Sequence, residues 1–182
     1  MNFNIGFSVA LLLGCVTSSM AQPAPAAPSP ATMVVVAGSG TAGFEDGTGA
    51  AARFNKPIRL APFGPDEVLV ADIFNHALRT VSKDGRVRTL AGAPERKGHS
   101  DGPAAGAWFN SPHGVGVAED GRIAVAEAGN HTLRLLTADQ RAAGGYTVTT
   151  LAGVPGEKGM RNGPAAQALF NSPHAALFGP GG

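Results

Sequence analysis

From residue 33 onward the chain is a series of short apolar runs separated by glycine, proline and polar residues. One stretch, residues 66–84, is ambiguous because it lacks glycine and proline, and Val70, Phe74 and Leu78 also fit the apolar stripe of a helix. The matching stretch in a later copy of the same motif carries Gly129 in its middle, and two copies should share one structure. We therefore predict a strand at 68–71, a turn through Asn75 and a strand at 77–82.

Internal repeats support this interpretation. Phe54, Phe109 and Phe170 each end the same pattern of glycine, alanine and phenylalanine, and they recur at nearly equal intervals. The motifs NHALR at 75–79 and NHTLR at 130–134 follow Phe54 and Phe109 at the same separation. Register kept across three copies indicates an architecture built from repeated units.

Each full unit holds four short apolar runs, which we predict to be strands. In the first unit they are 58–62, 67–71, 77–82 and 87–91, and in the second 114–118, 122–126, 132–137 and 146–151. Four strands in about 55–60 residues is the size of a propeller blade, so the predicted fold class is all-β.

Residues 1–32 differ from the rest, because they carry no charged side chain. Ile5–Val16 is an apolar run too short to span a bilayer comfortably, and Ser19-Met20-Ala21 fits a small-x-small cleavage site. We expect residues 1–21 to be a signal peptide, 22–32 a proline- and alanine-rich linker and 33–182 the folded domain. The expected location is periplasmic or secreted, with a lipid anchor at Cys15 as the alternative to a free form.

The repeated pattern, AG…DG…A-x-F-x-x-P followed by VAD-x-x-NH-x-LR, resembles the NHL-repeat β-propeller family over essentially all of 33–182. More distantly it is similar to peptidylglycine amidating lyases and SMP-30/gluconolactonase-type propellers. The resemblance implies a propeller that has six blades when complete. We expect about two full blades here, at 55–92 and 110–152, with a third begun near 164, a leading strand at 33–38 and an opening strand at about 174–178. The chain is then either a fragment or part of a ring assembled from several chains.

Composition narrows the function classes. The 14 basic and 13 acidic residues give a net charge of +1, so we expect no nucleic-acid partner. The single cysteine excludes an internal disulfide framework. No Ser-His-Asp set or pair of carboxylates can be assembled with a meaningful spacing. Gly38, Gly40 and Gly43 form a G-x-G-x-x-G triplet, but glycine and proline prevent the helix that a dinucleotide site needs.

The NHL motifs are interpreted as parts of the fold. Asn75 and Asn130 would cap turns, and the arginines of the two motifs would pair with Asp72 or Glu127 just upstream. Asp46-Gly47, Asp101-Gly102 and Asn162-Gly163 are interpreted as turn dipeptides.

The candidate site is the pair His113 and His174, each in a P-H-x motif at the start of a strand beside the predicted channel. In the amidating lyases that the chain resembles, histidines of such a motif hold a catalytic zinc, which makes these two the candidate metal ligands. Ile58 replaces histidine in the first copy, so a third ligand would come from another blade, from His99 or from water. No other cofactor is expected.

The predicted function is that of an exported propeller that binds a protein or a small molecule at its channel mouth. The alternative is a metal-dependent lyase or a lactone hydrolase with its site at the same place. A third interpretation is a two-blade, lectin-like chain that completes its ring by oligomerising. Fold alone does not decide among them. No membrane span is expected.

Overall fold

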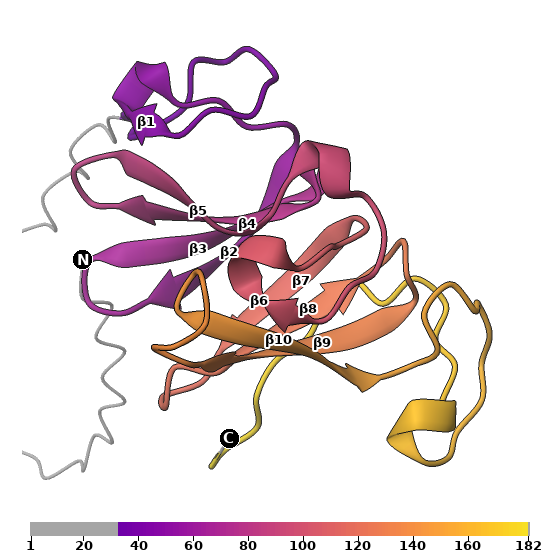
Figure 1. The fold of residues 1–182 in the computed structure, drawn as a ribbon. Coiled ribbons are helices and arrows are strands. Elements are labelled where there is room, and N and C mark those ends of the chain that lie inside the picture. The colour runs from indigo at the N-terminus through magenta and orange to yellow at the C-terminus, as the bar shows by residue number, and fades with distance from the viewer. Residues whose placement is uncertain (1–32, 182) are drawn as a thin grey trace, which may run out of the picture. The chain divides into compact units, whose positions relative to one another are not determined.

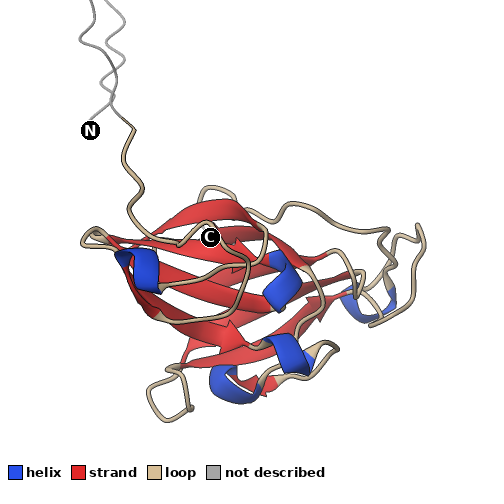
Figure 2. Ribbon diagram, turned by 90° about the horizontal axis from the view of Figure 1, so that it is seen from above, coloured by secondary structure: helices blue, strands red, loops and turns tan. Residues whose placement is uncertain are grey.

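The computed structural model describes residues 33–181, which form two five-stranded antiparallel sheets (Figures 1 and 2). The expected signal peptide, linker and Cys15 lie outside the described residues. The strands are β1 (Gly47–Thr48), β2 (Pro57–Phe63), β3 (Glu67–Asp72), β4 (Ala77–Ser82), β5 (Arg86–Gly92), β6 (Gly102–Pro103), β7 (Pro112–Val117), β8 (Ile123–Glu127), β9 (Thr132–Ala138) and β10 (Tyr146–Ala152). Single 3₁₀ turns lie at Gly49–Ala51, Ile73–Asn75, Pro94–Arg96, Ala104–Gly106 and Ala165–Gln167.

Both sheets have the same topology. Blade 1 has the strand order β1-β5-β4-β3-β2, and blade 2 has the order β6-β10-β9-β8-β7. Consecutive strands pair through tight turns, as the glycine- and proline-bounded runs of the sequence require. The very short strands β1 and β6 come from the loop that precedes each blade and add a fifth strand at its outer edge.

The eight strands predicted within the two full units are confirmed, with small differences only at their ends. The ambiguous stretch 66–84 contains only one helical turn, Ile73–Asn75, between β3 and β4, so the strand–turn–strand prediction is correct. The helical spacing of its apolar residues is a coincidence of two short strands whose side chains alternate between two buried faces.

Two predicted strands are absent: neither 33–38 nor 174–178 forms a strand. Within the described residues, 33–38 has no counterpart of β4 beside it, and 174–178 has no counterpart of β3 or β8. A strand needs the backbone donors and acceptors of a neighbour, so these two segments stay extended without a ladder.

The core lies between the two blades. Blade 1 contributes alanine and leucine side chains, and blade 2 contributes valine, isoleucine and leucine side chains. The buried set includes Ala61, Leu69, Ala71 and Leu78 from blade 1, and Val115, Ile123, Val125 and Leu136 from blade 2. Alternation along β3 and β8 sends every second residue into this layer, and each fully buried large side chain contributes about 1.5–3 kcal/mol.

Segment 173–178 lies directly against β7. A Cβ placed on Gly114 would stand 2.6 Å from the carbonyl oxygen of His174, and one on Gly116 would stand 2.6 Å from that of Ala176. Glycine is therefore required at both positions, because any side chain would push the third repeat away from blade 2.

Candidate functional site

A fully buried arginine anchors each blade. In blade 1, Arg79 donates from Nη1 to Asp72 Oδ2 at 3.1 Å and from Nη2 to Asp46 Oδ1 at 2.6 Å. Its guanidinium also donates to the backbone carbonyls of Glu45 and Arg53 and lies over the Phe54 ring, 5.2 Å from the ring centre. The arginine thus ties the loop before β2 to strands β3 and β4.

Blade 2 repeats this arrangement. Arg134 donates to Glu127 Oε2 at 2.8 Å and to Asp101 Oδ1 at 2.6 Å, and Phe109 lies over its guanidinium at 5.1 Å. It also donates to the carbonyls of Ser100 and Trp108. Apart from Nε of Arg79, which has no partner among the described residues, the N–H donors of both guanidinium groups are bound within these networks, so the motif arginines are structural.

The asparagines of the two motifs complete these networks. Asn75 donates to Asp72 Oδ2 at 2.7 Å and to the carbonyl of Gly43 at 2.8 Å. Asn130 donates to Glu127 Oε1 at 3.0 Å and to the carbonyl of Gly98 at 2.7 Å. The predicted pairs of Arg79 with Asp72 and of Arg134 with Glu127 are therefore confirmed.

Sequence reasoning missed the role of Asp46 and Asp101. Both were assigned only to turns, yet each pairs with a buried arginine of the NHL motif that follows it in the chain. Asp101 also accepts from the backbone N–H of Thr150 at 2.9 Å, which fastens the loop to β10. The signal was present, because an aspartate precedes the glycine of the turn in both full copies.

The histidines of the NHL motifs connect consecutive repeats. His76 accepts through Nδ1 from the backbone N–H of Ser111 at 3.1 Å, and His131 accepts in the same way from Ser172 at 3.1 Å. Both histidines have left-handed backbone, with φ of 51° and 60°. Each one therefore holds the start of the next repeat and has no free Nδ1 for a metal ion.

The structure brings His113 and His174 together. Their rings are stacked, with centres 4.0 Å apart and planes inclined by 17°. His113 Nδ1 lies 3.2 Å from the backbone carbonyl of His174. Because a carbonyl oxygen only accepts, Nδ1 carries the proton and donates, which leaves Nε2 of His113 free.

The electrostatic environment of this pair is cationic. Burial lowers the pKa of His113, and the neighbouring His174 and Arg59 lower it further, while the bond to the His174 carbonyl raises it. His174 and Arg59 are exposed, and His113 is half-buried. We call these three side chains the inner-edge cluster, since they lie at the starts of β2 and β7 and of the segment 173–178.

His99 does not join this cluster. Its Nε2 lies 2.7 Å from Thr150 Oγ1, on the loop beside Asp101, and burial lowers its pKa. Among residues 33–181 no group of three or more histidine, cysteine, aspartate or glutamate side chains is arranged to hold a metal ion. The expectation that His99 could supply a third ligand is therefore wrong, and the pair offers two imidazoles at most.

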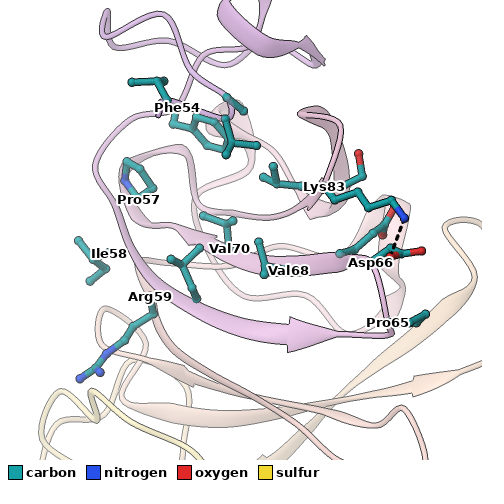
Figure 3. A pocket seen from close by; sticks show the side chains of 16 residues that line it. Phe54, Pro57, Ile58, Arg59, Pro65, Asp66, Val68, Val70 and Lys83 are labelled. Atoms are coloured by element: carbon teal, nitrogen blue, oxygen red, sulfur yellow. Dashed lines mark hydrogen bonds and ion pairs between the residues drawn. The ribbon is translucent and has the colours of Figure 1, made fainter. Parts of the chain in front are cut away.

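A separate hollow lies on the outer side of blade 1, with a volume of about 890 Å³ (Figure 3). Its lining is mainly apolar and includes Leu60, Val68, Val70 and Val81, which we call the open face. The counterparts of these residues in blade 2 are Val115, Ile123, Val125 and Leu136, and blade 1 covers them. The hollow therefore lies on the face of blade 1 that is equivalent to the face through which blade 2 packs on blade 1.

Among the described residues, no helix is long and apolar enough to cross a membrane.

Comparison with known proteins agrees with this geometry. Residues 109–134, from the repeat phenylalanine to the buried arginine of blade 2, match the NHL repeat. Protein SUPPRESSOR OF QUENCHING 1, chloroplastic, of Arabidopsis thaliana is 30% identical over 95 residues, which cover 52% of this chain and 9% of that protein. NHL repeat-containing protein 2 of Homo sapiens is 30% identical over 119 residues, covering 64% of this chain and 15% of that protein.

Solved structures share the fold. A Bacteroides thetaiotaomicron structural genomics protein of unknown function has a TM-score of 0.56 and 26% identity, over 62% of this chain and 27% of that chain. An auxiliary nutrient binding protein of Bacteroides thetaiotaomicron has a TM-score of 0.53 and 20% identity, over 63% of this chain and 30% of that chain. The chain thus spans less than a third of each of these relatives. It is an NHL-repeat protein whose repeats fold as neighbouring blades of the β-propeller type.

Proposed function

We propose that this chain is a binding module whose binding surface is the inner edge of the blades, at the starts of β2, β7 and segment 173–178. The observation that carries the proposal is a contrast between two sets of repeated positions. The buried arginine networks are similar in both blades and, apart from Nε of Arg79, their donors are hydrogen-bonded internally. The inner-edge positions change from Ile58 to His113 and His174, and the two histidines present polar groups to solvent.

The test is a screen for ligands that perturb the inner-edge histidines. Imidazole resonances of His113 and His174 would be followed by NMR while neutral sugars, oxyanions and zinc chloride are added. The variant His99→Ala serves as a matched control, because His99 is a partly buried histidine bound to Thr150. A ligand class that moves both inner-edge resonances, and still does so in His99→Ala, supports the proposal. Resonances that respond to no probe would contradict it.

A second candidate is a metal-dependent lyase or a lactone hydrolase with its site at the channel mouth. The observation in its favour is the adjacency of two imidazoles, one of which has a free Nε2. Because protein zinc sites take three or four ligands, a pair supplies only part of one. We expect weak zinc binding by calorimetry, lost in His113→Ala. Tight binding would favour the enzyme, and no binding at all would remove this candidate.

We also propose that the protein is exported, from the apolar run Ile5–Val16 and the small residues that follow it. Mass spectrometry of the native product tests this. Cleavage after Ala21 would leave Gln22 at the N-terminus, and the anchored alternative would leave a lipid-modified Cys15. Recovery from the cytoplasm of a chain that still begins at Met1 would contradict export.

A further inference from the structure

We propose that Asn162 is a site of spontaneous covalent modification, at which its side-chain amide is converted to a carboxylate through a cyclic imide with Gly163. The inference is independent of the proposed binding function. Asn162-Gly163 is the one Asn-Gly pair in the sequence, and it lies in the third repeat where both full copies have an aspartate followed by glycine. The inference rests on the different ways in which these three turns are held.

The reaction joins two groups that are adjacent in the chain. The backbone nitrogen of Gly163 loses its proton and attacks Cγ of Asn162. The new N–Cγ bond forms, the bond from Cγ to Nδ2 breaks, and Nδ2 leaves with a proton as ammonia. Water, the one co-reactant, then opens the imide at either carbonyl and gives aspartate or isoaspartate. Glycine favours the attack, because it has no side chain to hinder its nitrogen.

In blade 2, hydrogen bonds hold the corresponding atoms in place. Asp101 accepts from Arg134 at 2.6 Å and from the backbone N–H of Thr150 at 2.9 Å. Gly102 pairs with Val148 in the ladder between β6 and β10. Blade 1 holds its own Asp-Gly turn in the same way. A side chain and a backbone fixed by such bonds cannot turn toward each other to form a ring.

The turn of the third repeat lacks these bonds. Asn162 and Gly163 are both exposed, and neither the Asn162 side chain nor the Gly163 N–H has a hydrogen-bond partner within residues 33–181. In that same range no strand pairs with Gly163. Both residues line a hollow of about 960 Å³, which admits water and leaves room for the imide. The two reacting groups are therefore unrestrained.

The rest of the turn keeps the geometry of its counterparts. Gly163 has a φ of 146°, and the equivalent glycines have φ of 157° and 120°. Arg161 and Leu169 exchange backbone hydrogen bonds of 3.3 and 3.0 Å, as Ser100 and Trp108 do in the second repeat. A carboxylate formed at position 162 thus occupies the place of the aspartates in both full copies. Modification gives the third repeat an acidic turn that its sequence does not encode.

Asn171 provides an internal control in the same repeat. It is also exposed, but the residue after it is Ser172, whose backbone N–H donates to His131 Nδ1 at 3.1 Å. A nitrogen bound in this way is not available for attack, and the serine side chain hinders it further. We therefore expect Asn171 to stay intact while Asn162 is converted.

The experiment follows the full chain during incubation at neutral pH in water labelled with heavy oxygen. Tandem mass spectrometry of proteolytic peptides locates the change. We expect position 162 to exchange its amide for a carboxyl that carries one labelled oxygen, as both aspartate and isoaspartate, while Asn171 is unchanged. Asn162→Gln should slow conversion at this position by at least about tenfold, because glutamine must close a larger ring. Equal conversion of Asn162 and Asn171 would overturn the proposal.

Two further measurements test the part played by the hydrogen bonds. Asp101→Asn places the same dipeptide in blade 2, where conversion in the folded protein should be at least about tenfold slower than at Asn162. In concentrated urea the two positions should react at the same rate. Equal rates in the folded variant would overturn the structural argument.

Circular dichroism shows whether the Asp101→Asn variant folds. If it does not, the unsubstituted chain decides the matter through the rate at Asn162 with and without urea. We expect these two rates to agree within about tenfold, because the turn leaves both groups unrestrained. An Asn162 that is converted in urea but stays intact in the folded chain would overturn the proposal.

Discussion

At the scale of single residues, removing a buried arginine should cost more stability than removing an exposed one. Arg134 and Glu127 are both fully buried and lie 2.8 Å apart. An arginine removed from such a pair leaves a carboxylate without its counter-charge in a medium of low dielectric. By contrast, the pair of Arg122 with Asp120 is exposed to solvent, where an ion pair contributes little.

We predict that Arg134→Met lowers the free energy of unfolding by about 3–5 kcal/mol, because Glu127 is left buried and unpaired. Arg122→Met, the matched surface control, should change it by no more than about 1 kcal/mol. Chemical denaturation followed by circular dichroism measures both. A similar small effect for the two variants would show that the buried network is dispensable.

The hydrogen bond from the Ser111 N–H to His76 predicts that the stability of the fold depends on pH. Burial lowers the pKa of His76 below its ordinary value of 6.5, and Lys97 acts in the same direction. His76 of the unfolded chain therefore takes up a proton at higher pH than His76 of the folded chain. The stability that neutral His76 contributes to the fold is therefore fully present above pH 6.5, and it is lost as pH falls toward the pKa of His76 in the folded chain. Protonation also removes the acceptor for the Ser111 N–H.

We expect the Tm to be lower at pH 5.0 than at pH 7.5, and His76→Asn to show a smaller difference. Asparagine tolerates the left-handed backbone at this position but does not titrate. His99 and His113 also have a lowered pKa, and they titrate equally in both proteins. If the Tm changed by the same amount between the two pH values in both proteins, His76 would not be the source of the pH dependence.

At the scale of elements, the position of the third repeat depends on how closely its backbone approaches β7. Segment 173–178 has no ladder of its own, so it depends on contact with β7. The contact is possible because β7 carries glycine at positions 114 and 116. At these two positions the backbone of segment 173–178 lies so close to β7 that a side chain would not fit between them. The stacking of His113 on His174 follows from this contact between segment 173–178 and β7.

Gly116→Ala should therefore move segment 173–178 and separate the two rings, since the added Cβ would stand 2.6 Å from the Ala176 carbonyl oxygen. The nuclear Overhauser effect between the His113 and His174 ring protons should be lost. Gly106→Ala is the control, because nothing lies within 4 Å of its added Cβ. An unchanged ring contact in Gly116→Ala would show that the segment is held by other residues.

At the scale of the whole molecule, no sheet among residues 33–181 packs on the open face of blade 1, whereas blade 1 covers the equivalent face of blade 2. Leu60 on the open face is 68% exposed, whereas its counterpart Val115 is 6% exposed between the blades. Apolar surface of this kind is stabilised by burial against another sheet. We therefore expect the chain to associate through the open face of blade 1.

We predict that the purified chain self-associates and that Leu60→Lys reduces the association. The lysine charge would have to be desolvated in any complex that covers the open face. Met160→Lys is the control, since Met160 is 97% exposed and lies outside that face. Sedimentation velocity measures the distribution of species. A monomer in both proteins, or equal association in both, would contradict the prediction.

Much of this structure follows from sequence alone, for a physical reason. The two NHL motifs and the three phenylalanines keep register, so each local ambiguity in one copy could be resolved by another, as Gly129 resolved residues 66–84. Strand positions, turns and the pairing of Arg79 with Asp72 depend on residues that are close together in the chain. Short-range patterns carry that information.

Only the tertiary structure decided the longer links. Asp101 pairs with Arg134 from a separate loop, and His113 meets His174 from the following repeat. Local sequence does not specify such contacts, because they depend on how one blade packs on the next. The same packing placed His99 beside Thr150 rather than in the candidate site. Segments 33–38 and 174–178 form no strand, because the described residues include no neighbouring strand for either of them. The repeats thus determine what each blade is, and the packing between blades determines which side chains meet.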